Sequence, residues 1–502
     1  MTGLPTRRSR RACTTMLAIA LTALAAPMGA SGHAAPAGES GHARRARARS
    51  VHPVRVTLTS ANLRRALSSM PALGFGRIRP NERTIWVDPR VRYQSVVGFG
   101  AAMTDTSAWL LYDELPARTR ANVMADLFGS EGIGLNYVRV PMGASDFTVS
   151  GLPYSYDDMA AGQSDPTLAD FSIAHDDAYI LPALQMMMRL NPSTDVFAAP
   201  WSLPGWMKAN DALNNIDYRG ALLPSDFAVA AGYYVRFIQA YAQAGVPVSA
   251  IAPINEGGTP SEYPGMNLDD EPEFITGYLV PALRAAGLGT AVYDLDGTGF
   301  SNEEQWLANP AYRSTIAGTA VHCYAGLEQM SGLHEINPTG SLIMTECSPG
   351  VTSYATSEAA IASLRNFSQA VILWNLALDP NGGPKQHVPG CAACYGLVTV
   401  DQSNHRAELN LNYYQLGQVS KFVRRGAVRI ASTRWVSDYA SSSGIDYGVT
   451  PGLDNVALEN PDGSEVLVVY DNSLHPIHFQ VAWDGRGFTY TLGAGATVTF
   501  TW

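Results

Sequence analysis

The sequence lacks an excess of basic residues and has no apolar run of membrane-spanning length. Its 502 residues carry 34 Lys and Arg against 44 Asp and Glu, a net charge of −10. This balance argues against a nucleic-acid partner, which usually meets a basic protein face. No G-x-G-x-x-G or Walker lysine loop follows a strand-like run, which disfavours a nucleotide cofactor. Because 46% of the residues are hydrophobic, we expect a globular protein rather than a disordered one.

The basic residues that are present concentrate at the N-terminus. Four arginines precede the apolar run 16–26, and Ala-, Gly- and Ser-rich sequence follows. The run is shorter than the ~20 apolar residues of a permanent anchor, and the pattern is typical of a secretory signal. We expect a signal peptide over 1–35, a basic linker over 36–50 and a secreted protein. The Ser9-Arg10-Arg11 run leaves a twin-arginine signal open, and a disordered tail is the alternative.

Cysteine is scarce, with five in the chain, and Cys13 lies in the expected signal. Cys391 and Cys394 form a C-x-x-C in a Gly- and Pro-rich stretch, a spacing that favours a local disulfide in an exported chain. Free thiols and a metal or redox site are alternatives, although a four-cysteine zinc site needs a second pair at ligand spacing. We therefore expect no metal site. Cys323 and Cys347 stand alone in the sequence, and we expect them to be buried thiols in strands.

Short apolar runs alternate with amphipathic stretches from about residue 95 to 425. The strand-like runs are 95–103, 135–143, 195–201, 249–256, 291–297, 319–326, 341–348 and 370–380, and the helical patterns are 105–128, 175–190, 224–245, 271–286, 303–316, 355–368 and 408–425. Non-alternating runs suit parallel strands that are buried on both faces. Eight of them predict a (β/α)8 barrel over 93–425, with an open doubly wound sheet as the alternative.

The pattern changes after residue 426. Strand-like segments separated by turn signals follow at 428–432, 455–460, 465–470, 477–483 and 489–501. They predict a small antiparallel β-sandwich over 426–502. Residues 51–92, with strand-like segments at 54–58 and 84–87, are expected to add strands to the same unit.

Polar side chains stand near the ends of seven of the eight expected barrel strands. They are Asp105, Arg139, Trp201, the pair Asn255 and Glu256, the pair His322 and Tyr324, the pair Thr345 and Glu346, and the pair Trp374 and Asn375. Functional residues of such barrels lie at the carboxyl ends of the strands. Buried polar groups are also costly unless they are paired. We therefore expect these side chains to form a single site.

Glu256 and Glu346 indicate glycoside hydrolysis with retention. This reaction needs one carboxylate as nucleophile and one carboxylic acid as proton donor, ~5–5.5 Å apart. The rings of Trp201 and Trp374 offer apolar faces for sugar C–H groups, and Asn255 is placed to reach a sugar hydroxyl. The alternative is that both glutamates form interior salt bridges with a basic residue such as Arg139.

Seven ordered blocks over about residues 85–430 resemble glycoside hydrolase family 30, the glucosylceramidase-like enzymes. They are GFGAAMTD at 98–105, YVRVPMG at 137–143 with SDF at 145–147, PWSLPGWMK at 200–208 with Asn210, INE at 254–256, MTE at 344–346, WNLALDP at 374–380 with GGP at 382–384, and YYQLG at 413–417 with SKFV at 420–423. The resemblance implies a barrel joined to a β-sandwich built from both chain ends. It also implies hydrolysis of a β-glycoside without a metal or an organic cofactor.

Residue roles follow from the matching positions. The resemblance implies that Glu346 is the nucleophile and Glu256 the acid/base. It implies a sugar subsite lined by Asp105, Trp201, Asn255 and Trp374. It also implies that His322 and Tyr324 lie beside the nucleophile and that Arg139 lies in the layer of residues that supports them.

Two positions depart from the family pattern. Gly257 stands where the family usually has a proline, which leaves the loop that shapes the leaving-group side undefined. Cys323 stands where the strand-six motif commonly has a tryptophan. The loop with Cys391 and Cys394 is expected near the cleft rim.

The sequence thus predicts a secreted retaining β-glycosidase whose partner is a carbohydrate or a glycolipid. Glucosylceramide and a β-1,6-glucan are the leading substrate classes, and endo-acting cleavage of the glucan is an alternative. Cleavage of a β-xyloside or a β-galactan by the same family is an alternative. A non-catalytic carbohydrate-binding barrel is a further alternative, and the presence of both glutamates counts against it.

Overall fold

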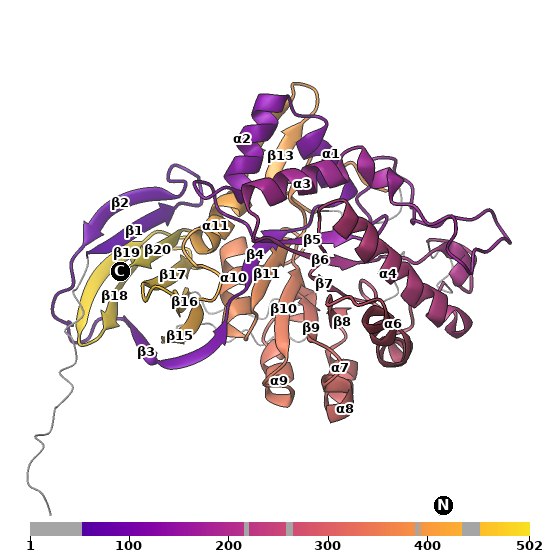
Figure 1. The fold of residues 1–502 in the computed structure, drawn as a ribbon. Coiled ribbons are helices and arrows are strands. Elements are labelled where there is room, and N and C mark those ends of the chain that lie inside the picture. The colour runs from indigo at the N-terminus through magenta and orange to yellow at the C-terminus, as the bar shows by residue number, and fades with distance from the viewer. Residues whose placement is uncertain (1–52, 215–219, 258–264, 387–390, 392, 434–451) are drawn as a thin grey trace, which may run out of the picture. The chain divides into compact units, whose positions relative to one another are not determined.

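Eight parallel strands form a barrel in the computed structural model, which describes residues 53–214, 220–257, 265–386, 391, 393–433 and 452–502 (Figure 1). The strands are β4 (Gly98–Ala101), β5 (Tyr137–Pro141), β6 (Asp195–Ala199), β7 (Ala250–Ile251), β8 (Ala291–Gly297), β9 (Gly318–His322), β10 (Ser341–Glu346) and β11 (Ala370–Leu373). They pair in the order β4-β11-β10-β9-β8-β7-β6-β5. Each of the eight expected runs contains one of them or overlaps it.

Hydrogen bonds between β4 and β5 close the barrel. Met103 N donates to Arg139 O at 2.8 Å, and Asn136 N donates to Phe99 O at 3.0 Å. A Cβ at Gly100 would overlap the carbonyl oxygen of Tyr137, so only glycine allows β4 and β5 to approach this closely. The closed (β/α)8 barrel is confirmed, and the open-sheet alternative is wrong.

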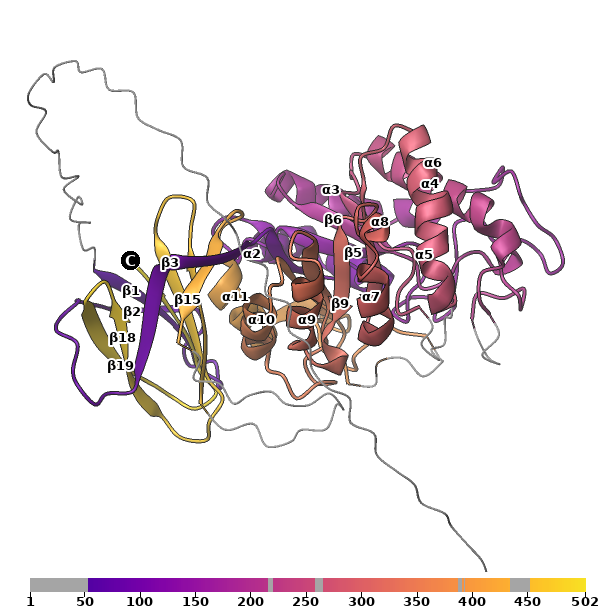
Figure 2. The same cartoon turned by 90° about the horizontal axis from the view of Figure 1, so that it is seen from below.

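Helices surround the barrel strands (Figures 1 and 2). They are α1 (Asp105–Tyr112), α2 (Ala117–Phe128), η1 (Ala174–Asp177), α3 (Ile180–Leu190), η2 (Gly205–Met207), η3 (Pro224–Asp226), α4 (Phe227–Gln243), η4 (Leu268–Asp270), α5 (Glu271–Glu273), η5 (Phe274–Leu279), α6 (Val280–Ala285), α7 (Phe300–Leu307), α8 (Pro310–Arg313), η6 (Cys323–Ala325), α9 (Gln329–Ile336), α10 (Thr356–Arg365) and α11 (Leu411–Ser420). The single helix expected over 105–128 is two helices, because Pro116 forms the N-cap of α2. The sequence patterns did not predict α9, a short helix that contains Gly332.

Apolar side chains fill the barrel interior. Tyr137, Phe197 and Tyr293 are buried there beside small residues such as Ala199 and Ala250. The hydroxyl of Tyr293 donates to Ser341 Oγ at 3.1 Å, which satisfies its polar group. The barrel is therefore a packed core, and polar chemistry is left to its carboxyl-terminal end.

A nine-stranded sheet forms the second domain. Its strands are β1 (Val54–Thr59), β2 (Ser68–Leu73), β3 (Thr84–Ser95), β15 (Val428–Ser432), β16 (Leu453–Glu459), β17 (Glu465–Asp471), β18 (Ile477–Trp483), β19 (Arg486–Leu492) and β20 (Thr497–Thr501). They pair in the order β19-β18-β3-β15-β16-β17-β20-β1-β2, so β3 lies between two C-terminal strands while β1 and β2 extend the sheet beyond β20 (Figure 1). A sandwich built from both chain ends is confirmed.

Some details of this sheet differ from expectation. β3 and β18 pair in parallel, so the unit is not wholly antiparallel. The segment 489–501 contributes to two strands, because the chain turns between β19 and β20 at a Gly495 with φ of 67°. The domain packs on the barrel through polar contacts such as Ser357 Oγ with Thr497 Oγ1 at 2.7 Å.

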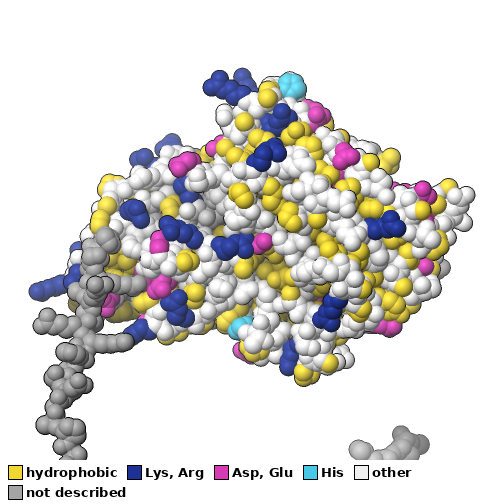
Figure 3. Space-filling view, viewed as in Figure 1, with side chains coloured by type: hydrophobic (Ala, Val, Ile, Leu, Met, Phe, Trp, Pro, Cys, Tyr) yellow, Lys and Arg dark blue, Asp and Glu magenta, His cyan; other side chains and the backbone are white. Residues whose placement is uncertain are grey.

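A three-stranded sheet that the sequence did not predict follows the last barrel strand. It contains β12 (Ala377–Leu378), β13 (Val398–Asp401) and β14 (Arg406–Leu409). Within the described ranges, no helix combines the length and the hydropathy needed to cross a bilayer. The expected signal over 1–35 and linker over 36–50 lie outside the described residues. On the face drawn in Figure 3, the described Lys and Arg side chains are spread among acidic ones.

Candidate active site

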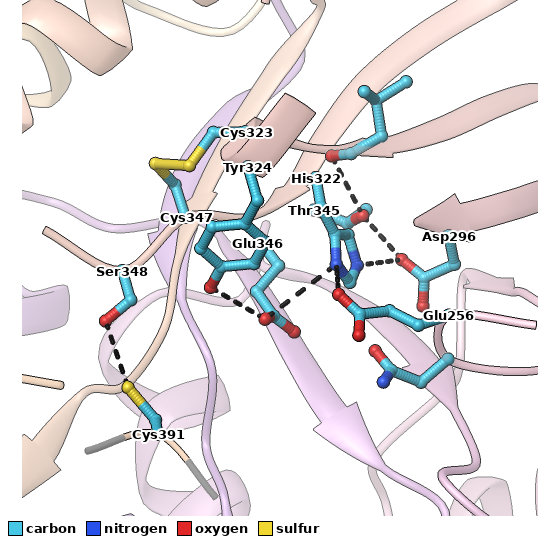
Figure 4. A network of polar contacts seen from close by, with 12 residues as sticks. Glu256, Asp296, His322, Cys323, Tyr324, Thr345, Glu346, Cys347, Ser348 and Cys391 are labelled. Atoms are coloured by element: carbon cyan, nitrogen blue, oxygen red, sulfur yellow. Dashed lines mark hydrogen bonds and ion pairs between the residues drawn. A yellow bond between two sulfur atoms is a disulfide. The ribbon is translucent and has the colours of Figure 1, made fainter. Parts of the chain in front are cut away.

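The two glutamates converge at the carboxyl end of the barrel (Figure 4). Glu346 is the last residue of β10, and Glu256 follows the short strand β7. One oxygen of each carboxylate and one ring nitrogen of His322 all lie within 4.8 Å of one another. This spacing is close to that of retaining glycosidases and shorter than the ~6.5–9.5 Å of inverting ones.

Arg139, from β5, is fully buried and joins three neighbouring groups. Its Nη1 donates to Glu346 Oε2 at 2.5 Å, while Nη2 donates to Asn255 Oδ1 and to Asp296 Oδ2, both at 2.6 Å. Burial alone would lower the pKa of Arg139, but the two carboxylates raise it. The guanidinium therefore stays cationic and orients three side chains from different strands or loops.

His322, at the end of β9, links Glu256 to Asp296. Its Nδ1 lies 2.8 Å from Glu256 Oε1, and its Nε2 lies 3.3 Å from Asp296 Oδ1. Burial would lower the pKa of His322, but Glu346, Asp296 and Glu256 together raise it to about 10. The ring is therefore an imidazolium that donates to both neighbours. Glu346 thus forms an ion pair with Arg139, and Glu256 pairs with His322.

Asp296 is a central residue that the sequence reasoning missed. It ends the stretch Asp294-Leu295-Asp296 of β8, the one barrel strand that supplied no candidate. Thr345 Oγ1 donates to its Oδ1 at 2.6 Å, opposite the bond from Arg139. Burial would raise the pKa of Asp296, but Arg139, His322 and Thr345 lower it to about 2. Two carboxylates in an otherwise apolar strand were the signal that could have revealed it.

The backbone around Asp296 is in a sparsely populated conformation. Leu295, Asp296 and Glu256 have φ values of 67°, 39° and 51°. Glu256 N donates to Asp296 O at 3.0 Å, and the buried carboxylate of Glu271 accepts from Leu295 N at 2.8 Å. Positive φ in non-glycine residues persists only where the surroundings hold it, and it clusters at functional sites. These hydrogen bonds fix the point from which the Glu256 side chain projects into the site.

Two tryptophans form an aromatic wall beside Arg139. The rings of Trp201 and Trp374 stack with centroids 5.0 Å apart, and the Arg139 guanidinium carbon lies 4.5 Å from the Trp201 ring centre. They are only 5% and 2% exposed. Much of their apolar surface is therefore used inside the protein, where it shields the buried cation.

Asp105 belongs to a separate hydrogen-bond cluster. Its carboxylate accepts from Val149 N at 2.8 Å and from the hydroxyls of Tyr154 and Tyr179, each at 3.2 Å, and it lies 2.8 Å from His175 Nε2. Among the described residues, none of its hydrogen bonds reaches either glutamate. The sequence did not indicate this ring of partners, which lie between β5 and β6, on a loop, in η1 and at the start of α3.

Tyr324 completes the surroundings of Glu346. Its hydroxyl donates to Glu346 Oε1 at 2.9 Å, so each oxygen of that carboxylate has one protein donor. Glu256, His322 and Glu346 also have the spacing of a metal-binding group. A histidine ligand must be neutral, whereas the carboxylates that face both ring nitrogens of His322 favour its protonated form.

Both pairs of described cysteines form disulfides. Cys391 joins Cys394 in the expected loop, where Ser348 Oγ donates to Cys394 Sγ at 2.9 Å. The expectation of free thiols at Cys323 and Cys347 is wrong, because they form the second disulfide. They follow adjacent strands, β9 and β10, and their Cα atoms lie 5.2 Å apart, within the range of a disulfide.

Comparison with known proteins matches both domains. The glycosyl hydrolase family 30 TIM-barrel domain matches residues 96–423, and the beta sandwich domain of the same family matches residues 426–500. An endo-1,6-beta-D-glucanase of Neurospora crassa is 34% identical, over 82% of this chain and 87% of its own. A lysosomal acid glucosylceramidase of Mus musculus is 27% identical, over 86% of each chain.

Solved structures agree with this match. The endo-beta1,6-glucanase BT3312 superposes with a TM-score of 0.76 and 28% identity, over 90% of this chain and 99% of its own. SrfJ from Salmonella typhimurium gives a TM-score of 0.80 over the same shares of the two chains, and at 24% identity it supports the fold alone.

Substitution of Asp296 by Asn should lower the pKa of His322 below its native value of about 10, because one facing carboxylate is lost. Since the native pKa is raised, the ion pairs of His322 stabilise the fold fully below pH 6.5, and this contribution is lost as the pH rises toward 10. Nitrogen-15 NMR of the imidazole follows the titration directly.

Thr345→Val is the matched control, since it removes a bond to Asp296 and keeps the carboxylate; it should move the pKa of His322 less. A native His322 that titrates near pH 6.5, or a pKa that Asp296→Asn leaves unchanged, contradicts this description of the site.

Proposed function

The chain belongs to glycosyl hydrolase family 30 and is an O-glycosyl hydrolase, and we propose that it cleaves a β-1,6-linked glucan with retention of configuration. The main support is similarity to endo-1,6-beta-D-glucanases over most of the chain, at 34%, 30% and 31% identity for three fungal proteins. The glucosylceramidase of Mus musculus is less similar, at 27%. Glucosylceramide is the second candidate substrate.

In this proposal Glu346 is the nucleophile. Arg139 and Tyr324 each bind one of its oxygens, so the carboxylate is held in one orientation toward the anomeric carbon. Glu346 attacks that carbon and forms a glycosyl ester, and its electron pair returns when water cleaves the ester. The same two donors then stabilise the carboxylate as it leaves.

Glu256 is the acid/base in this proposal. Its side chain is 22% exposed, against 9% for Glu346, which suits a group that meets the leaving group and then water. His322 donates to Oε1 and leaves the other oxygen for proton transfer. Glu256 protonates the leaving oxygen in the first step and removes a proton from water in the second.

The remaining predicted residues are proposed to surround the sugar. Asn255 has its carbonyl oxygen on Arg139, and because its amide nitrogen has no partner among the described residues, we propose that it faces a sugar hydroxyl. Trp201 and Trp374 wall the subsite, and Asp105 lies on its rim among tyrosines. We keep Asp105 as a sugar-binding residue in the proposal because of the family resemblance; since a carboxylate accepts about four hydrogen bonds, a sugar hydroxyl would replace one of its four protein partners.

Export is also part of the proposal. The pattern of the first 35 residues predicts a signal peptide, and the four described cysteines form two disulfides. Disulfides persist in oxidising compartments and are rare in the cytosol.

An exposed aromatic side chain on the rim favours a polymer over a small glycoside. Tyr395 directly follows the Cys391–Cys394 disulfide and is 59% exposed. Its ring lies against Gly350, where φ is 103° and a Cβ would come within 2.5 Å of Tyr395 Cε2. Gly350 lies in the loop that follows Glu346. One edge of the ring therefore lies against the protein, and we propose that its exposed part stacks on a sugar unit of the polymer.

Product analysis tests the substrate directly. The enzyme should release β-1,6-linked oligosaccharides from a soluble β-1,6-glucan and little glucose from glucosylceramide in detergent micelles. Glu346→Gln should release neither product. Faster turnover of glucosylceramide than of the glucan would contradict the proposed substrate and leave the assignment to the family intact.

Replacing Tyr395 by Ala should raise KM for the glucan roughly tenfold, the equivalent of about 1.4 kcal/mol of lost stacking. It should leave hydrolysis of an aryl β-glucoside, which is too short to reach the rim, within about twofold of the native rate. Tyr395→Phe keeps the ring and should behave as the native enzyme does.

Trp86→Ala is the matched control, because it removes a similarly exposed ring, 54% exposed, from β3 of the sandwich. It should leave KM for the glucan unchanged. An equal loss on the glucan for Trp86→Ala and Tyr395→Ala, or no loss for Tyr395→Ala, would contradict the role of Tyr395.

A further inference from the structure

The backbone ladder between β9 and β10 ends at the active site. Its last pair is His322 with Glu346, after an irregularity between Met344 and Glu346. Beyond this pair, β9 is followed directly by η6, and β10 is followed by a loop. Main-chain hydrogen bonds of the ladder therefore no longer fix the two strand ends where the proposed nucleophile is presented.

The Cys323–Cys347 disulfide joins the segments that follow β9 and β10 immediately beyond this last pair. Cys323 follows His322, and Cys347 follows Glu346 (Figure 4). The next residue after Cys323 is Tyr324, whose hydroxyl donates to Glu346 Oε1 at 2.9 Å. The segment after β9 is thus joined to the end of β10 twice, by the disulfide of Cys323 with Cys347 and by the hydrogen bond of Tyr324 with Glu346.

A third contact anchors the same segment. The carbonyl oxygen of Cys347 accepts from Trp374 N at 3.0 Å, which ties it to the end of β11. Cys323 and Cys347 are 1% and 0% exposed and lie within the main hydrophobic core. Solvent and reductants therefore have little access to the folded disulfide, which argues for a permanent constraint and not for a reversible switch.

We propose that the Cys323–Cys347 disulfide is a positioning element that holds Tyr324 and His322 in register with Glu346. This inference rests on the proposed role of Glu346 as nucleophile. Hydrogen bonds and packing behind reacting groups set their geometry, and a displacement of about 1 Å can cost roughly 100-fold in rate. The cysteines act through their neighbours and do not touch the sugar.

The Cys323→Ala/Cys347→Ala double variant tests this proposal on the full chain. At 25 °C, kcat for an aryl β-glucoside should fall roughly 10- to 100-fold with KM changed less than about threefold, because the reacting geometry is lost while the subsite remains. Either single alanine variant should lose as much as the pair, since each removes the same bond. Circular dichroism confirms that each variant is folded.

A variant that lowers stability without touching this link is the matched control. Leu333→Ala empties a buried position on α9, the helix between β9 and β10. It should lower the melting temperature and leave kcat at 25 °C near the native value. If this double variant does not fold, Cys323→Val/Cys347→Ala is tested in its place, because valine fills more of the space that the disulfide leaves.

A double-mutant cycle with Tyr324→Phe separates positioning from general stabilisation. If the disulfide aligns the Tyr324 hydroxyl with Glu346, Tyr324→Phe should lower kcat much less in the disulfide-free background than in the native one. Additive losses, or a native kcat in the folded disulfide-free variant, would overturn the proposal. So would peptide mapping of active native enzyme that finds free thiols at both positions.

The native enzyme separates this proposal from the proposed function. If native protein hydrolyses no β-glucoside, the proposed function fails before the disulfide is tested. If native protein is active and the folded disulfide variants keep its kcat, the positioning role fails and the proposed function stands.

Discussion

One buried guanidinium determines the layout of the active centre. Arg139 is fully buried and binds the fully buried carboxylate of Asp296, the largely buried carboxylate of Glu346 and the amide oxygen of Asn255. Taking such charges out of water is favourable only when each is paired, so none of these side chains can be replaced alone at low cost. His322 supplies the second cation, which lies between Glu256 and Asp296. Two cations and the carboxylates around them form one interdependent group.

The rest of the barrel holds this group in place. The members come from β5, β8, β9 and β10 and from the loop after β7, so closure of the barrel is what brings them together. Hydrogen bonds to Leu295 and Glu256 keep an unusual backbone conformation where Asp296 turns toward the centre. Trp201 and Trp374 exclude water from one side of the guanidinium. The Cys323–Cys347 disulfide begins where the ladder between β9 and β10 ends.

Much of this arrangement could be predicted from the sequence. The eight barrel strands are local apolar runs, and a local pattern is enough to find them. Polar residues near the ends of those runs marked Arg139, Glu256, His322 and Glu346. Asp296 escaped because it is embedded in its strand, and its importance depends on contacts with three other strands.

Other features depended on the folded barrel and left little local signal. Cys323 and Cys347 are 24 residues apart, and only the pairing of β9 with β10 brings them together. The partners of Asp105 come from a loop after β5, from η1 and from the start of α3, and the helical pattern over 175–190 does not show which residues contact Asp105. The helix α9 was missed because it is short and contains Gly332. Sequence patterns therefore located the strands and most acid–base residues, whereas cross-strand links required the structure.

Covalent trapping is the most direct test of the central claim that Glu346, held by Arg139 and Tyr324, is the nucleophile of a retaining enzyme. A 2-deoxy-2-fluoro-β-glucoside with a good leaving group slows turnover of the glycosyl ester, and peptide mass mapping locates the bound sugar. The native enzyme should form a single fluoroglucosyl adduct, on Glu346. An adduct on Glu256, or turnover that gives the inverted α-anomer without any adduct, would contradict it.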